Sequence, residues 1–165
     1  MLNTDLPKRK SNRLKNYDYS ASGYYFITIC TANRKKLFSF VVGQPLAAAE
    51  IKLTKIGKNA ETQLFNLEKR YKNIQIEKYV IMPNHIHLIL KINNTAAASG
   101  RPTVSNIIRA YKSITTKECR KFYDGDIWQT SFYDHIIRNE NDYLKIWNYI
   151  DTNPDKWAED KYYAE

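Results

Sequence analysis

Residues 73–93 limit what this chain can fold into more than any other segment. They read NIQIEKYVIMPNHIHLILKIN, two runs rich in the β-branched and aromatic residues that favour strands. Pro83 stands between the runs with a fixed φ and no N–H to donate, and Asn84 follows it, so the chain is expected to turn there. The segment therefore predicts a β-hairpin.

The second run of this hairpin has two chemically different faces, because successive side chains of a strand point to opposite sides. Four apolar residues share one face: Ile86, Leu88, Leu90 and Ile92. They predict the main core face, so His85 and His87 must project from the other side. Residues two apart on a strand lie about 6.5 to 7 Å apart, close enough for two imidazoles to bind one divalent ion.

The remaining elements follow from periodicity. GYYFITICT, from residue 23, predicts a central strand that is covered on both faces. Apolar spacings of three and four predict helices from about residue 47 to 70 and from Thr103, a typical N-cap. Residues 127–137 predict another extended run, and residues 140–152 a last helix, since Pro154 disfavours helical geometry at the residue before it.

This order of elements predicts an α+β fold of the ferredoxin-like or RRM-like plan, an antiparallel sheet with helices packed on it. The length of 165 residues suits one domain, which we assign to residues 21–165 after a basic arm over residues 1–20. No apolar run approaches the roughly 18 residues of a membrane span, and the first residues lack the apolar core of a secretory signal. We therefore expect a cytoplasmic protein without membrane contact.

The composition points to a polyanionic partner. Lys and Arg number 26 against 17 Asp and Glu, and 13 tyrosines accompany this net charge of +9. Cations neutralise phosphates and aromatic rings stack on unpaired bases, so nucleic acid is the expected ligand. The candidate contacts are six basic residues and one histidine: Arg13, Lys15, Arg101, Arg109, Lys112, Arg120 and His135. For each basic residue the alternative is a solvated charge.

The last helix offers a further ligand and a hydroxyl for the histidine pair. At 100° per residue, four residues form its core stripe: Tyr143, Ile146, Trp147 and Ile150. Tyr149 and Asn153 fall outside this stripe and stack at i and i+4, so a phenol and an amide oxygen could face one point. The alternatives are a tyrosine at the rim of the core and an asparagine that ends the helix.

Three segments taken together, YVIMPNHIHLIL, WQTSFYDHIIRNENDY and NYIDTNP, resemble the REP-associated tyrosine transposases. These form a branch of the single-tyrosine HUH transposases, named for two histidines that flank a bulky hydrophobic residue. RLKNYDYSASGYYFITICTANR, IIRAYKS and NPDKWAED extend the resemblance over residues 13 to 160. Residues 21–165 would then form a transposase catalytic domain.

The resemblance implies a metal-dependent enzyme that recognises a hairpin in single-stranded DNA and cleaves beside it. His85 and His87 would bind Mg²⁺ or Mn²⁺, Tyr149 would form a 5′-phosphotyrosine link, and Asn153 would complete the metal site. Related insertion-sequence transposases often carry glutamine at that last position. The branch implies a monomer acting in cis, with a homodimer that exchanges the tyrosine helix as the alternative.

Two other functions are compatible with the same residues. An RRM-type module would bind nucleic acid through its sheet without any chemistry. A zinc-dependent hydrolase would use His85 and His87 to release free DNA ends and would form no link to Tyr149.

Overall fold

The computed structural model describes residues 14–43, 48–93 and 102–163. It contains an antiparallel sheet of four strands in the order β4-β5-β1-β6. The strands of this sheet are β1 (Gly23–Cys30), β4 (Ile74–Ile81), β5 (His85–Ile92) and β6 (Tyr133–Ile137). The predicted α+β fold with an antiparallel, ferredoxin-like sheet is thereby confirmed.

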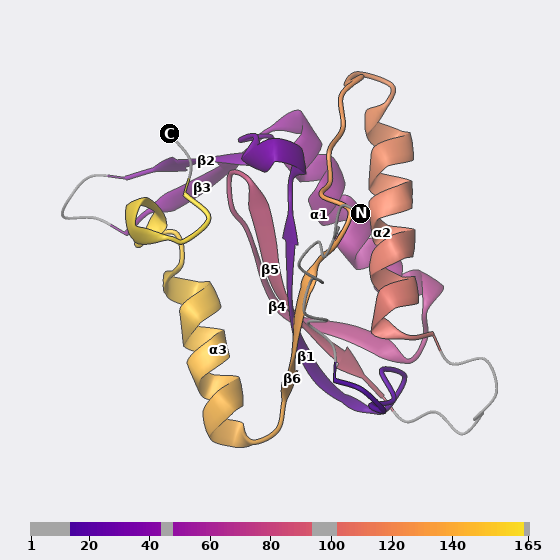
Figure 1. Ribbon diagram of the computed structural model, residues 1–165. Coiled ribbons are helices and arrows are strands. Elements are labelled where there is room, and N and C mark those ends of the chain that lie inside the picture. The colour runs from indigo at the N-terminus through magenta and orange to yellow at the C-terminus, as the bar shows by residue number, and fades with distance from the viewer. Residues whose placement is uncertain (1–13, 44–47, 94–101, 164–165) are drawn as a thin grey trace, which may run out of the picture.

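Helices cover both faces of the sheet. Figure 1 shows α1 (Lys55–Arg70) and α2 (Val104–Cys119) on one side and α3 (Glu140–Thr152) on the other. Two short 3-10 helices, η1 (Ala32–Arg34) and η2 (Trp157–Glu159), follow β1 and α3. The sheet is therefore the middle layer of three, and its two faces have different environments.

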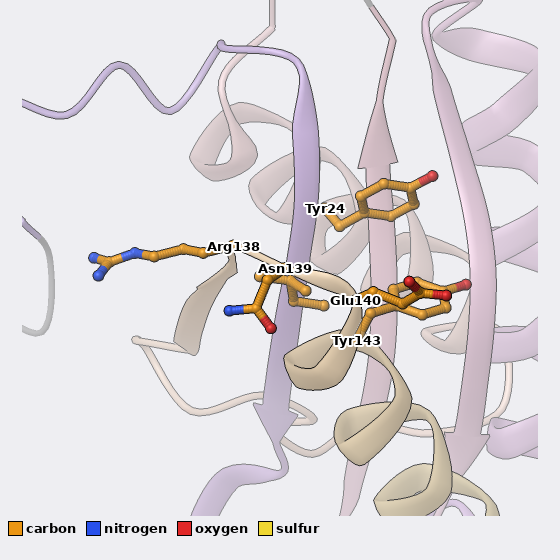
Figure 2. A pocket seen from close by; sticks show the side chains of 6 residues that line it. Tyr24, Arg138, Asn139, Glu140 and Tyr143 are labelled. Atoms are coloured by element: carbon orange, nitrogen blue, oxygen red, sulfur yellow. The ribbon is translucent and has the colours of Figure 1, made fainter.

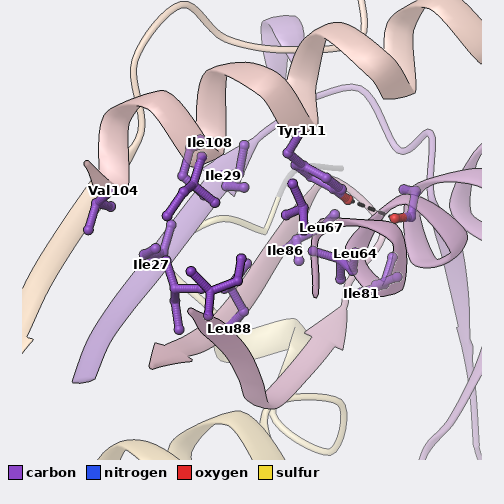
Figure 3. Packing of buried hydrophobic residues seen from close by; sticks show 14 of the residues in the cluster. Ile27, Ile29, Leu64, Leu67, Ile81, Ile86, Leu88, Val104, Ile108 and Tyr111 are labelled. Atoms are coloured by element: carbon purple, nitrogen blue, oxygen red, sulfur yellow. Dashed lines mark hydrogen bonds between the residues drawn. The ribbon is translucent and has the colours of Figure 1, made fainter. Parts of the chain in front are cut away.

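The larger core lies between the sheet and the α1–α2 pair. Figure 3 shows Ile27 of β1 and Leu88 of β5 packed beneath α2, as the alternation of both strands predicts. The hydroxyl of Tyr111 on α2 donates to the carbonyl of Ala60 on α1 at 3.0 Å, so the buried phenol has a partner. The predicted core face of the second hairpin strand is confirmed.

The α3 face holds a much smaller buried cluster. Four residues form it: Phe26, Ile89, Ile137 and Ile150. Within α3 itself only Ile150 is fully buried, and Tyr143, Ile146 and Trp147 pack around the cluster at its rim. The predicted stripe of α3 is confirmed, and the rest of this face is left for polar side chains.

The predicted start of the first helix, at about residue 47, is wrong. A strand, β3 (Glu50–Leu53), precedes α1 and pairs with β2 (Ser39–Val42). Ile51 and Leu53 alternate with charged residues at a period of two, and Leu53 also continues the helical spacing, so the two patterns overlap. The side chain of Thr54 accepts a hydrogen bond from Gly57 N and fixes the true beginning of the helix.

The predicted extended run over residues 127–137 is only partly right, because β6 begins at Tyr133. Before it, Trp128 forms an isolated bridge with Thr31, and the following residues form a loop. The ammonium group of Lys112 on α2 donates to the carbonyls of Gln129 and Ser131 at 2.7 and 3.0 Å. In this loop the side chain of Lys112, and not a neighbouring strand, donates the hydrogen bonds to these carbonyls.

Gly57 allows a direct test of the close packing between α1 and the backbone of Phe38. A Cβ atom built on Gly57 would overlap the carbonyl oxygen of Phe38. We expect Gly57→Ala to lower the free energy of unfolding by about 1–3 kcal/mol through overpacking, although alanine is the better helix former by about 1 kcal/mol. Urea unfolding measures this, with the exposed Lys58→Ala as the control; a more stable Gly57→Ala protein would contradict the close approach.

Candidate active site

The two histidines of β5 are fully buried and are held by hydrogen bonds at Nδ1. The Nδ1 atom of His85 donates to the amide oxygen of Asn84 at 2.9 Å, since that oxygen can only accept. Nδ1 of His87 lies 2.8 Å from the hydroxyl of Thr28 on β1. With both Nδ1 atoms engaged, both Nε2 atoms are turned toward the α3 side of the sheet.

Burial keeps both imidazoles neutral. It lowers the pKa of His85 to about 4, although the nearby carboxylate of Asp160 acts in the opposite direction. The pKa of His87 is lowered as well, first by burial and then by the charge of His85. Neutral imidazoles with available Nε2 lone pairs are the form in which histidine binds metals.

The donor atoms around the histidine pair fit a cation. Ligand atoms of His85, His87 and Asp160 all lie within 4.8 Å of one another. Among the described residues, His85 Nε2 and Asn153 Oδ1 are buried without a hydrogen-bond partner. Such atoms are costly to leave unsatisfied, and two imidazoles with oxygen donors form a common divalent-metal set.

Asp160 was not among the residues singled out from the sequence, yet it lies at the centre of this group. Its Oδ2 accepts a hydrogen bond from Asn153 Nδ2 at 2.8 Å and lies 4.0 Å from His85 Nε2. Its Oδ1 accepts from the backbone N–H of Tyr162 at 2.7 Å. The carboxylate therefore joins the end of α3 to the histidine pair.

Tyr149 lies beside the same group. Its hydroxyl is 3.3 Å from His87 Nε2, and its ring meets the imidazole edge to face at 5.2 Å between centroids. Burial, followed by the charge of Asp160, raises the pKa of Tyr149 to about 12. The phenol is thus placed at the site but is protonated at neutral pH. The structure brings together the four residues predicted for the centre: His85, His87, Tyr149 and Asn153.

The segment after α3 covers the histidines. The ring of Tyr162 lies 4.7 Å from that of His85, between centroids. Asn84 Nδ2 donates to the Tyr162 carbonyl at 2.7 Å and to the Arg34 carbonyl at 3.3 Å. Sequence reasoning missed Asn84, Thr28 and Tyr162, because their roles depend on segments that meet only in the folded chain.

A cavity of about 350 Å³ opens next to the phenol. It is lined by two lysines, two acidic residues, three aromatic residues and two polar residues: Phe26, Tyr133, Tyr149, Thr152, Asn153, Lys156, Glu159, Asp160 and Lys161. Acidic and basic groups therefore face one space, as suits a metal ion together with a phosphate.

Figure 2 shows a different hollow, of about 430 Å³, at the beginning of α3. The rings of Tyr24 and Tyr143 line it, while the side chain of Arg138 extends away from them. Asn139 accepts a hydrogen bond from Asp142 N and serves as the helix cap. No histidine lines this hollow, so it is separate from the candidate site.

Comparison with known proteins now identifies the family. A family model described as "Transposase IS200 like" matches residues 19–153. The chain belongs to the IS200-like transposases. The matched region includes both histidines, Tyr149 and Asn153, and it ends before Asp160.

Individual proteins agree with this assignment and with the predicted resemblance. The transposase is 33% identical over 180 residues to a Haemophilus influenzae protein of uncharacterised function, covering 99% of this chain and 97% of that one. It is 29% identical to the REP-associated tyrosine transposase of Escherichia coli, with coverage of 84% and 70%.

A solved structure supports the fold. The structure of a REP-associated tyrosine transposase bound to a REP hairpin superposes with a TM-score of 0.65 at 23% identity, covering 90% of this chain and 77% of that one. None of the helices in the described part of the transposase is long and apolar enough to cross a membrane.

The predicted DNA contacts of the transposase lie in several places. Arg109, Lys112 and Arg120 line a shallow hollow of about 460 Å³ along α2. Figure 1 shows α2 on the opposite side of the sheet from α3. Burial lowers the pKa of Lys112 to about 8. His135 is on the α3 side, where its Nε2 lies 2.9 Å from Asp142 Oδ2. Lys15 is exposed near the beginning of the described chain.

Two further predicted contacts, Arg13 and Arg101, lie outside the described residues, as does most of the predicted basic arm.

Acid should destabilise the metal-free transposase through His85. Its folded pKa of about 4 is below the unfolded value of 6.5, so the unfolded state binds more protons between these values and stability falls as the pH falls through them. We expect His85 to contribute a loss of about 3 kcal/mol between pH 7 and pH 4. Urea unfolding in EDTA measures it, and His85→Gln should remove that part of the pH dependence. An unchanged dependence in the variant would contradict the buried neutral ring.

Proposed function

We propose that the protein is a metal-dependent single-strand DNA transposase that recognises hairpin-bearing DNA, nicks it through Tyr149 and rejoins strands. The observation that carries the proposal is the 3.3 Å separation between the Tyr149 hydroxyl and His87 Nε2, inside a group of metal-ligating side chains. A nucleophile and a metal centre are the two parts that such a reaction requires.

His85 and His87 would hold the metal, with oxygen ligands from Asp160 and Asn153. We propose Asp160 as the stronger oxygen ligand, because a carboxylate adds charge that an amide lacks. Asn153 supports it through the hydrogen bond to Asp160 and through its own unpartnered oxygen. Mg²⁺ or Mn²⁺, when bound, would polarise the scissile phosphate and help to orient it.

Asp160 also links the metal centre to the reactivity of Tyr149. Its charge is one reason for the raised pKa of the phenol, so a cation held by this carboxylate would favour ionisation of Tyr149. The phenolate oxygen then bonds to phosphorus, and the 3′ oxygen leaves and takes up a proton. The 5′-phosphotyrosine retains a phosphodiester, so attack by another 3′-OH restores tyrosine and joins the strands.

The single-chain arrangement supports action in cis by a monomer. Tyr149 and both histidines of one chain already meet, so no residue from a second copy is needed to complete the group. An exchanged tyrosine helix would require α3 to leave this position. We therefore propose a monomer, with the homodimer as the alternative.

The hairpin partner is proposed from the relatives and from charge. The solved relative was bound to a REP hairpin, and the α2 hollow presents Arg109, Lys117 and Arg120 for phosphate contacts. We propose that Lys112 instead mainly holds the 129–131 loop. Lys15 and His135 remain predicted contacts, as do Arg13 and Arg101.

Tyr149→Phe should abolish covalent attachment to a labelled hairpin oligonucleotide in Mn²⁺, because it removes only the attacking oxygen. Binding should stay within about twofold, since most affinity comes from phosphate contacts. A denaturing gel detects the adduct, and Tyr143→Phe serves as the matched control on the same helix. Free DNA ends without an adduct, produced equally by Tyr149→Phe, would instead favour a zinc-type hydrolase.

Metal binding can be measured without DNA. Mn²⁺ should raise the melting temperature, because a ligand at 100 times its Kd stabilises the folded state by about 2.7 kcal/mol. We expect His87→Ala to remove this shift and Asp160→Asn to weaken Mn²⁺ binding by roughly 10- to 100-fold. Asn153→Ala should weaken it less. The reverse order for Asp160 and Asn153 would show that the asparagine is the principal oxygen ligand.

A further inference from the structure

A second cavity, of about 240 Å³, adjoins the candidate active site. Seven residues line it: Thr28, Cys30, Gln129, Ser131, Phe132, Tyr133 and Tyr162. Two of them lie next to the proposed metal ligands, since Thr28 contacts His87 and Tyr162 packs on His85. Any molecule in this cavity would therefore lie directly beside the proposed reaction.

Tyr133 is the residue that this cavity shares with the cavity at Tyr149. It is the first residue of the edge strand β6 and is 41% exposed, a large fraction for an aromatic ring. The ammonium group of Lys161, which lines only the Tyr149 cavity, lies 5.7 Å from its ring centroid. The ring therefore stands between the cavity at Tyr149, where acidic and basic groups meet, and a second, smaller cavity.

The polar wall of the second cavity is fixed in place before any ligand arrives. Gln129 N donates to the Cys30 carbonyl at 3.0 Å, and Lys112 holds the carbonyls of Gln129 and Ser131. Within the described part of the chain, the side chains of Gln129 and Ser131 make no hydrogen bond. A hydrogen-bonded backbone with an amide and a hydroxyl group beside an exposed ring suits a flat, polar ligand.

We infer that this cavity binds one unpaired nucleobase next to the scissile phosphate, stacked on Tyr133 and hydrogen-bonded through its edge by Gln129 and Ser131. This inference rests on the proposed function, because it takes the ligand from the DNA strand processed at Tyr149. Every base has a face that can stack on tyrosine. The amide of Gln129 pairs best with the N6 and N7 atoms of adenine, so adenine is the preferred base.

Stacking can be observed without cleavage. The probe is a hairpin oligonucleotide with 2-aminopurine at successive positions of its unpaired flank, bound to the Tyr149→Phe protein. Emission should be quenched at one position, and Tyr133→Ala in the same background should remove the quenching. Tyr163→Ala is the matched control, because Tyr163 is 39% exposed and lines neither cavity. Quenching at no position, or quenching that survives Tyr133→Ala, would overturn the inference.

The preference for adenine over the other bases tests the role of Gln129 separately from stacking on Tyr133. An abasic site at the quenched position should weaken binding by roughly 10-fold or more, and Tyr133→Ala should add no further loss with the abasic DNA. Gln129→Ala should reduce the preference for adenine over the other bases. Additive losses would contradict stacking, and an unchanged preference would contradict the role of Gln129. Melting temperatures of all variants confirm that they are folded.

The outcomes also separate this inference from the proposed function. An adduct at Tyr149 without quenching would overturn the base site alone. Quenching without an adduct in the wild-type protein would retain the base site and contradict the nicking reaction.

Discussion

The pairing of β1 with β5 in a fixed register is the constraint on which the rest of the structure depends. It sets Thr28 opposite His87 and Cys30 opposite His85. A shift of one residue would send both imidazoles into the main core and turn four aliphatic side chains toward α3. Because the wrong register would bury unpaired imidazoles and expose aliphatic side chains, the large α1–α2 core that stabilises the fold also determines where the histidines point.

The α3 face shows the opposite balance between packing and polarity. Its buried apolar cluster is small, and beside it two buried polar atoms, His85 Nε2 and Asn153 Oδ1, have no hydrogen-bond partner among the described residues. Folding without a ligand leaves these groups unsatisfied, which lowers stability. The main core supplies the stability that allows such a group to persist, as is common where residues are arranged for function.

The sequence allowed much of this arrangement to be predicted, because strong periodicities determine it. The alternation along β5 and the two flanks of α3 follow from local geometry, and so did the positions of His87 and Tyr149 relative to their elements. Asp160 could not be found in this way, because it lies in a short irregular segment where no period links it to the histidines. The β2–β3 pair was missed because Leu53 fits both the strand and the helix period. The 129–132 loop was missed because its carbonyls are bonded by the side chain of Lys112 and not by a neighbouring strand, which no sequence period reveals.

The single amide of Asn84 has consequences for how this protein can vary. Its oxygen orients the His85 ring, while its nitrogen holds the carbonyls of Arg34 and Tyr162, which come from distant parts of the chain. No other side chain type offers an acceptor and two donors in so short a reach, except the longer glutamine. Replacing Asn84 would therefore disturb both the orientation of the His85 ring and the attachment of the segments at Arg34 and Tyr162. Natural selection for either of these two properties is also selection for the other.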